Sequence, residues 1–146
     1  MTIRQLLAHA VAVGTVAAVS MTGLTGTASA AAASGDHLSR GETLNAGQFI
    51  ERSTSTGHVK LIMQSDGNLV EYGRYFGVCW ATHTENSGGA YATYQTDGNL
   101  VIYTAAGRAV WASNTVGSVQ ATGSTVDMNN AGQLYIGTRR FNDGCR

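Results

Sequence analysis

The chain has 146 residues and no formal net charge, because nine Lys and Arg residues balance nine Asp and Glu residues. This balance argues against a nucleic acid or an anionic membrane as partner. Only 12% of the residues are charged, 19 are glycine and none is proline, a composition that favours short strands joined by glycine turns.

The first thirty residues have the features of an export signal. Arg4 provides a positive charge, an apolar stretch follows over residues 6–19, and the small residues Ala-Ser-Ala at 28–30 suit a signal peptidase. An uncleaved anchor is the alternative, but the apolar stretch is shorter than the ~20 residues of a membrane-spanning helix. We expect a signal peptide over residues 1–30 and a secreted product without a membrane span.

Removal of the signal leaves residues 31–146, a length that suits one domain with one core. We expect residues 31–38 to be a flexible N-terminal segment and residues 39–146 to form the folded domain. The formal charge of this part is −1, since Arg4 is lost and all other charges remain. Such a weakly charged polar surface suits hydrogen bonding to an uncharged partner.

A nine-residue pattern is repeated along the domain. Residues 64–72 read QSDGNLVEY and residues 95–103 read QTDGNLVIY, at an offset of 31 residues. The same offset relates Trp80 to Trp111. A third, weaker copy reads AGQLYIG over residues 131–137, at an offset of 34 from the second copy. The domain is therefore built from three related units of about thirty residues.

Each unit has the pattern of a β-hairpin. Apolar and polar residues alternate over residues 59–64 and 68–72, and an Asp-Gly pair between them supplies a tight turn. One unit offers about four short strands, too few to bury an apolar face alone. We therefore predict an all-β domain of three four-stranded sheets around a shared core, with pseudo-threefold symmetry; an ordinary β-sandwich is the alternative. Leu69, Leu100 and Leu134 should point inward, and the repeated tryptophans should fill the centre.

Two cysteines, Cys79 and Cys145, lie in the exported part of the chain. Because that compartment is oxidising and only one intramolecular pairing exists, we expect a disulfide between them. Free thiols or an intermolecular bridge are the alternatives. At the repeat offset Cys145 takes the place of a tryptophan, so the bridge would join the first and third sheets and substitute for the missing aromatic ring.

The polar residues of the first copy are spaced to form one groove. Strand alternation puts Asn68, Val70 and Tyr72 on one face. Gln64 and Asp66 approach that face from across the hairpin. An ionised carboxylate accepts hydrogen bonds, an amide donates and accepts, and a phenol does either, which suits a ligand rich in hydroxyl groups. A stable turn without any ligand is the alternative explanation of this segment.

The pattern Gln-x-Asp-x-Asn-x-Val-x-Tyr resembles the signature of the bulb-type lectins, also called monocot mannose-binding lectins, and the resemblance spans the whole domain. It implies a β-prism of three antiparallel sheets and a site for mannose, mannosides or mannan that needs no metal and no cofactor. By this resemblance, Asp66 and Asn68 would hold the axial 2-hydroxyl. Gln64 would hold the 3-hydroxyl and Tyr72 the 4-hydroxyl, with Val70 against the sugar ring.

The second copy matches the pattern in full, whereas the third does not. By the same resemblance, the second mannose site consists of Gln95, Asp97, Asn99, Val101 and Tyr103. The third, degenerate site consists of Asn129, Ala131, Gln133, Tyr135 and Gly137. All five of these residues differ from the pattern, so we expect mannose binding to be lost there while Leu134 keeps its packing role.

Two further features bear on packing and assembly. Glu71 stands where the second copy has Ile102, facing the core, so it must find a partner or reach solvent. Members of the family often dimerise by exchanging a C-terminal strand, but the chain stops one residue after Cys145. We expect no strand exchange. A homodimer that forms without strand exchange is the alternative to a monomer.

Other functions fit the sequence less well. His37, His58 and His83 lie in polar stretches without a nucleophile motif. Asp66 and Asp97 belong to different sheets, too far apart for glycoside cleavage, so we predict that the protein is not an enzyme. The sequence has no calcium- or zinc-ligand spacing. The alternative function is a lectin-like antibacterial toxin or an adhesion protein that uses glycan binding for docking.

Overall fold

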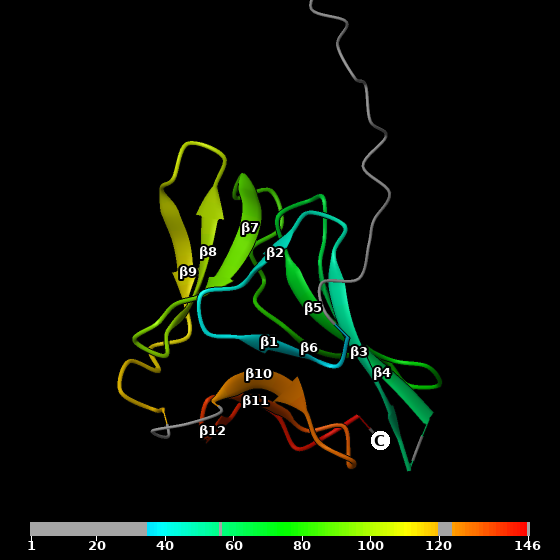
Figure 1. Cartoon of the computed structure of the whole chain (residues 1–146). Coiled ribbons are helices and arrows are strands. Elements are labelled where there is room, and N and C mark those ends of the chain that lie inside the picture. The colour runs from blue at the N-terminus through cyan, green and yellow to red at the C-terminus, as the bar shows by residue number, and fades with distance from the viewer. Residues whose placement is uncertain (1–34, 56, 120–123, 146) are drawn as a thin grey trace, which may run out of the picture.

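The computed structural model describes residues 35–55, 57–119 and 124–145, so the expected signal peptide over residues 1–30 lies outside the described part. The described residues form twelve β-strands (Figure 1). Among them there is no helix of the length and apolarity needed to cross a membrane. The strands are β1 (His37–Ser39), β2 (Thr43–Asn45), β3 (Phe49–Thr54), β4 (Gly57–Met63), β5 (Leu69–Gly73), β6 (Gly77–Ala81), β7 (Gly89–Tyr94), β8 (Leu100–Thr104), β9 (Ala109–Ala112), β10 (Thr125–Met128), β11 (Leu134–Ile136) and β12 (Arg139–Arg140).

The strands form three four-stranded sheets that enclose a common core (Figure 1). The first sheet has the order β3-β4-β5-β6, the second β2-β7-β8-β9 and the third β1-β10-β11-β12. The first, second and third sheets contain the first, second and third copies of the repeat. Neighbouring strands in each sheet are antiparallel. The predicted fold, an all-β prism of three four-stranded antiparallel sheets, is confirmed.

Only the first sheet is contiguous in sequence. β1 pairs with β10 and β2 pairs with β7, so the second and third sheets each take an edge strand from the start of the domain. β1 begins at His37, and the Leu38 side chain is fully buried. The expected boundary at residue 39 is therefore too late, because residues 37–38 complete the edge of the third sheet instead of forming a flexible segment.

Alternation along each strand builds the shared core. In β4 every second side chain is buried, and the three leucines predicted to point inward, Leu69, Leu100 and Leu134, are at most 1% exposed. Trp80 and Trp111, on the edge strands β6 and β9, pack against the core and against each other, as predicted, but they are only partly buried. Aliphatic side chains of the inner strands form the fully buried part of the core.

A disulfide joins Cys79 on β6 to Cys145, which follows β12, so it links the first and third sheets as predicted. Cys145 does not stand in for a tryptophan. Phe141 takes that place, since its ring centroid lies 5.8 Å from that of Trp80. Trp80 also contacts Trp111, at a centroid distance of 5.9 Å. Phe141 comes seven positions after Leu134, whereas Trp80 comes eleven after Leu69, because both the strands and the turn of the β11–β12 hairpin are shorter than those of the β5–β6 hairpin.

Candidate functional site

The turn between β4 and β5 positions the first groove. Gly67 has a φ of +96°, a conformation that glycine adopts without a side-chain clash. The Asp66 carboxylate accepts the Asn68 N–H at 2.9 Å through Oδ1. Asp66 is exposed, so its second oxygen faces solvent. Val70 is 3% exposed and forms the floor of the groove. The turn therefore fixes the carboxylate while leaving one acceptor free for a ligand.

Gln64 and Tyr72 meet across the hairpin. The Gln64 Nε2 amide donates a hydrogen bond to the Tyr72 hydroxyl oxygen at 2.8 Å, and both residues are half-buried. Because the amide donates, the Tyr72 proton can be donated to a ligand. The carbonyl oxygen of Gln64 can in turn accept a hydrogen bond from it. The pair is thus oriented by its own contact and still offers one donor and one acceptor.

Asn68 is held from behind by two residues to which the sequence analysis gave no role. Its Oδ1 accepts the Thr82 hydroxyl at 2.9 Å and the Thr84 N–H at 3.2 Å, and the residue is only 9% exposed. These contacts turn the Nδ2 amide toward the groove as a donor. The signal was present, since Thr82-x-Thr84 recurs as Ser113-x-Thr115 at the repeat offset.

The second groove repeats this arrangement on the second sheet. The Gln95 amide donates to the Tyr103 hydroxyl at 2.6 Å, and the Asp97 carboxylate accepts the Asn99 N–H at 2.9 Å. The Asn99 Oδ1 accepts the Ser113 hydroxyl at 3.0 Å. It also accepts the Thr115 N–H at 3.3 Å, and Val101, 4% exposed, forms the floor. The structure therefore brings together all five sequence-predicted residues of each intact copy.

Both grooves offer two free acceptors and two free donors above an apolar floor. The acceptors are a carboxylate oxygen and an amide carbonyl, and the donors are an amide and a phenol. Burial of these groups without partners is costly, so a ligand that satisfies all four through its own hydroxyl groups is favoured. Such an arrangement suits one face of a neutral sugar ring.

The third groove is closed by its own chain. The Asn129 amide donates to the Gln133 carbonyl at 2.8 Å, and the Asn129 oxygen accepts the Ala131 and Gln133 N–H groups at 2.9 and 3.1 Å. Gly137 replaces the tyrosine because a Cβ atom there would lie 1.9 Å from the Ser118 carbonyl oxygen. Asn129, at the glutamine position, therefore has no tyrosine hydroxyl to donate to, and the polar groups of this copy bond to one another.

The three histidines that the structure describes do not assemble a reactive centre. His58 and His83 are exposed, and His37 lies beside Asp36 with Nδ1 at 2.9 Å from the carboxylate. No group of three or more His, Cys, Asp or Glu side chains that could hold a metal ion occurs in residues 35–55, 57–119 and 124–145.

Solved structures of plant lectins resemble most of the chain. The mannose-specific agglutinin of snowdrop bulbs (Galanthus nivalis), complexed with methyl-α-D-mannoside, is 34% identical over 76% of this chain and 97% of the agglutinin, with a TM-score of 0.59. A garlic (Allium sativum) lectin is 31% identical over 68% and 90% of the two chains, with a TM-score of 0.55. The mannose-specific bulb lectin of bluebell (Scilla campanulata) is 26% identical over 75% and 92%, with a TM-score of 0.60. A scan of protein-family models found no match, and neither did a search of curated proteins.

The prism fold, the two polar grooves and these similarities define a carbohydrate-binding protein, a lectin. The snowdrop agglutinin shares 34% of its residues with this chain over almost its whole length. The chain therefore belongs to the bulb-type lectin family, and the family resemblance read from the sequence is confirmed at this level.

Proposed function

We propose that the protein binds mannose or mannose-containing glycans through its first and second grooves, without a metal ion. One observation carries the proposal: both grooves hold the same free donors and acceptors with the same internal hydrogen bonds. The family relationship supports it, because the snowdrop agglutinin was solved with a mannoside.

The proposed contacts follow from which atoms are free. In the first groove Asp66 Oδ2 accepts from the axial 2-hydroxyl and Asn68 Nδ2 donates to it. Gln64 and Tyr72 bind the 3- and 4-hydroxyls, and the ring lies on Val70. Glucose points its 2-hydroxyl in another direction, which leaves the Asp66 and Asn68 groups without partners. Mannose should therefore bind more tightly than glucose.

The test is a double variant, Asp66→Asn with Asp97→Asn, measured by mannose titration. An amide retains the oxygen that accepts the neighbouring N–H, so both turns persist. Each outward acceptor, however, becomes a donor that competes with the asparagine amide for the 2-hydroxyl oxygen. We expect a loss of about tenfold or more in mannose affinity, from one charge-assisted hydrogen bond. Asp127→Asn, the same change on the third sheet, is the matched control and should bind like the parent.

Two results would contradict the proposal. One is unchanged mannose affinity in the double variant with an unchanged far-ultraviolet spectrum. The other is equal affinity of the parent for mannose and glucose.

We also propose that the protein is secreted after removal of residues 1–30. The positive Arg4, the apolar stretch and the small residues at 28–30 support this, as does a disulfide, a bond typical of oxidising compartments. Mass analysis of protein released by expressing cells should show a chain beginning at Ala31. Recovery of the full-length chain from inside the cells alone would contradict the proposal.

A further inference from the structure

The first and second grooves differ beside the repeated motif. Lys60 on β4 is directly opposite Tyr72, so their Cβ atoms are separated by about 5 Å. The matching residue in the second sheet is Tyr91, opposite Tyr103, and the two rings stack with centroids 5.5 Å apart. The first groove thus has a cation where the second has an aromatic wall.

A hollow of about 470 Å³ extends from the first motif along β4. It is lined by Glu51, His58, Lys60, Ile62, Gln64, Tyr72, Gly73 and Arg74. Two of these residues, Gln64 and Tyr72, belong to the proposed mannose site, so the hollow is continuous with that site. The volume lies in the range of pockets for ligands larger than a single sugar ring, which leaves room for a substituent or a second residue.

Lys60 and Arg74, the two cations of the hollow, are positioned by different contacts. The Lys60 ammonium lies 4.1 Å from the centroid of the Phe49 ring and 3.9 Å from a Glu51 carboxylate oxygen. The Arg74 backbone N–H donates to the His58 carbonyl at 2.8 Å, which places this exposed residue beside the start of β4, and its guanidinium carbon lies 5.6 Å from the centroid of the Tyr75 ring. With one carboxylate against two cations, the lining has a formal charge of +1 when His58 is neutral.

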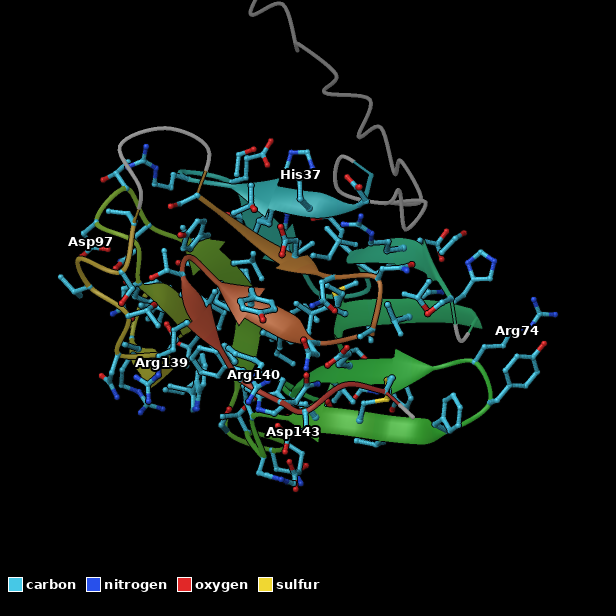
Figure 2. The ribbon with its side chains drawn as sticks, turned by 90° about the horizontal axis from the view of Figure 1, so that it is seen from below. His37, Arg74, Asp97, Arg139, Arg140 and Asp143 are labelled. Atoms are coloured by element: carbon cyan, nitrogen blue, oxygen red, sulfur yellow. A yellow bond between two sulfur atoms is a disulfide. The ribbon has the colours of Figure 1, made fainter. Side chains whose placement is uncertain are left out.

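The second groove offers no such charge at the equivalent positions. At the offset of 31 residues, Lys60 and Arg74 correspond to Tyr91 and Ala105. Figure 2 shows Arg74 at the edge of the molecule opposite Asp97, which marks the second groove. Lys60 and Arg74 therefore have no charged counterparts at the equivalent positions of the second groove, and Arg74 is remote from that groove.

We infer that the first groove selects mannosides that carry an anionic group, a phosphate or a carboxylate, next to the mannose ring, whereas the second groove takes neutral mannose. This inference rests on the proposed mannose binding. The motif holds the sugar, and Lys60 with Arg74 holds the anion beyond the Tyr72 end of the site. Charge-assisted hydrogen bonds to a phosphate or carboxylate favour a ligand with this substituent. The partial exposure of Lys60 and Glu51 limits the gain to about three- to tenfold in affinity.

The test uses two variants that each retain one groove. Asp97→Asn isolates the first groove and Asp66→Asn isolates the second. Each is titrated with mannose, with mannose 6-phosphate and with a disaccharide of mannose and glucuronic acid. The variant that retains the first groove should bind at least one anionic probe about three- to tenfold more tightly than mannose at low salt. It should lose this preference near 0.5 M NaCl, where charges are screened. The variant that retains the second groove should show no preference.

Charge removal then assigns the effect to residues. In the Asp97→Asn background, Lys60→Gln with Arg74→Gln should abolish the preference, measured as the ratio of anionic to neutral affinity. Arg108→Gln, in the corresponding hairpin of the second sheet, is the matched control and should keep the ratio. Preference for the phosphate probe alone or the carboxylate probe alone identifies the anion and supports the inference.

Equal affinity for mannose and both anionic probes in the Asp97→Asn variant overturns the inference and leaves mannose binding intact. A preference that survives loss of both cations also overturns it. Failure of the parent protein to bind mannose is a different result, since it removes the proposed function itself.

Discussion

Glu71 places a carboxyl group in the interior, where the second sheet has Ile102. The side chain is fully buried, and the Asn142 amide donates a hydrogen bond to its Oε2. Its Oε1 has no hydrogen-bond partner among the described residues. Burial raises the pKa of Glu71 to about 7, against the opposing effect of the Asn142 hydrogen bond. The partner expected for Glu71 from the sequence is thus an amide, which leaves the charged form poorly stabilised.

Stability should therefore fall as the pH rises through this pKa. The folded pKa of about 7 is above the ordinary value of 4.5, so the folded protein binds more protons between these values. The contribution is fully present below pH 4.5 and is lost by about pH 7. The free energy of unfolding changes by at most about 3 kcal/mol. Urea unfolding at several pH values should show this slope in the parent and a reduced slope in Glu71→Gln, which should be the more stable protein at pH 8.

The effect of Glu71 is the difference between the pH slopes of the parent and Glu71→Gln, because the other carboxyl groups titrate in both proteins. Parallel pH profiles of the parent and Glu71→Gln would show that the folded environment leaves this carboxyl unperturbed.

At the scale of elements, the hairpins could be predicted from the sequence and the assembly of the sheets only in part. The Asp-Gly turns and the alternation on either side predict β5 and β8, and the inward leucines follow from the same period of two. β1 and β2 have three residues each, too few to show a period, so their pairing with distant strands left no local signal.

The candidate site shows the same division. The five groove residues of each intact copy follow one another along a hairpin, so local geometry is enough to gather them. Lys60 lies on the same hairpin, opposite Tyr72, so its place beside the first groove also follows from local geometry. Asn142 reaches Glu71, and Phe141 reaches Trp80, only because the third sheet packs against the first. Such placements depend on tertiary packing, which no short segment encodes.

Gly73 shows how an element adapts to the disulfide. A Cβ atom at this position of β5 would lie 2.9 Å from Cys145 Sγ and 3.2 Å from Cys79 Sγ. Gly73→Ala should lower the free energy of unfolding by about 1–3 kcal/mol through overpacking. The same substitution in a protein with Cys79→Ala and Cys145→Ala should cost clearly less, and chemical denaturation of the four proteins gives the coupling. Equal costs in both backgrounds would mean that the bridge does not constrain this position.

At the scale of the whole molecule, the disulfide closes a long loop between the first and third sheets. Its cysteines are 66 residues apart, and the chain-entropy model gives a stabilisation of about 4 kcal/mol for a loop of this length. Cys79→Ser with Cys145→Ser should therefore lower the midpoint of urea unfolding markedly. A loss below about 1 kcal/mol would show that the reduced, unfolded chain is already compact.

The two intact grooves lie on different sheets, so one molecule can engage two branches of a glycan. Loss of one groove, by Asp97→Asn, should only halve the number of sites for free mannose. On a mannan-coated surface the same change should weaken retention about tenfold or more, because the second contact is intramolecular. Surface plasmon resonance on sparse and dense mannan separates these effects. A loss of only twofold on dense mannan would mean that the grooves act independently.

The strands at the start of the domain also set the order in which the chain can close. His37 pairs with Asp127, and Thr43 pairs with Thr93, at separations of 90 and 50 residues. Contacts this remote in sequence make folding slow, because the chain loses the conformational entropy of a long loop before the strand pairing stabilises it. A nascent chain therefore cannot finish its second and third sheets until most of it has been synthesised. The chain therefore remains incompletely folded during synthesis, which is compatible with the translocation that the proposed export signal requires.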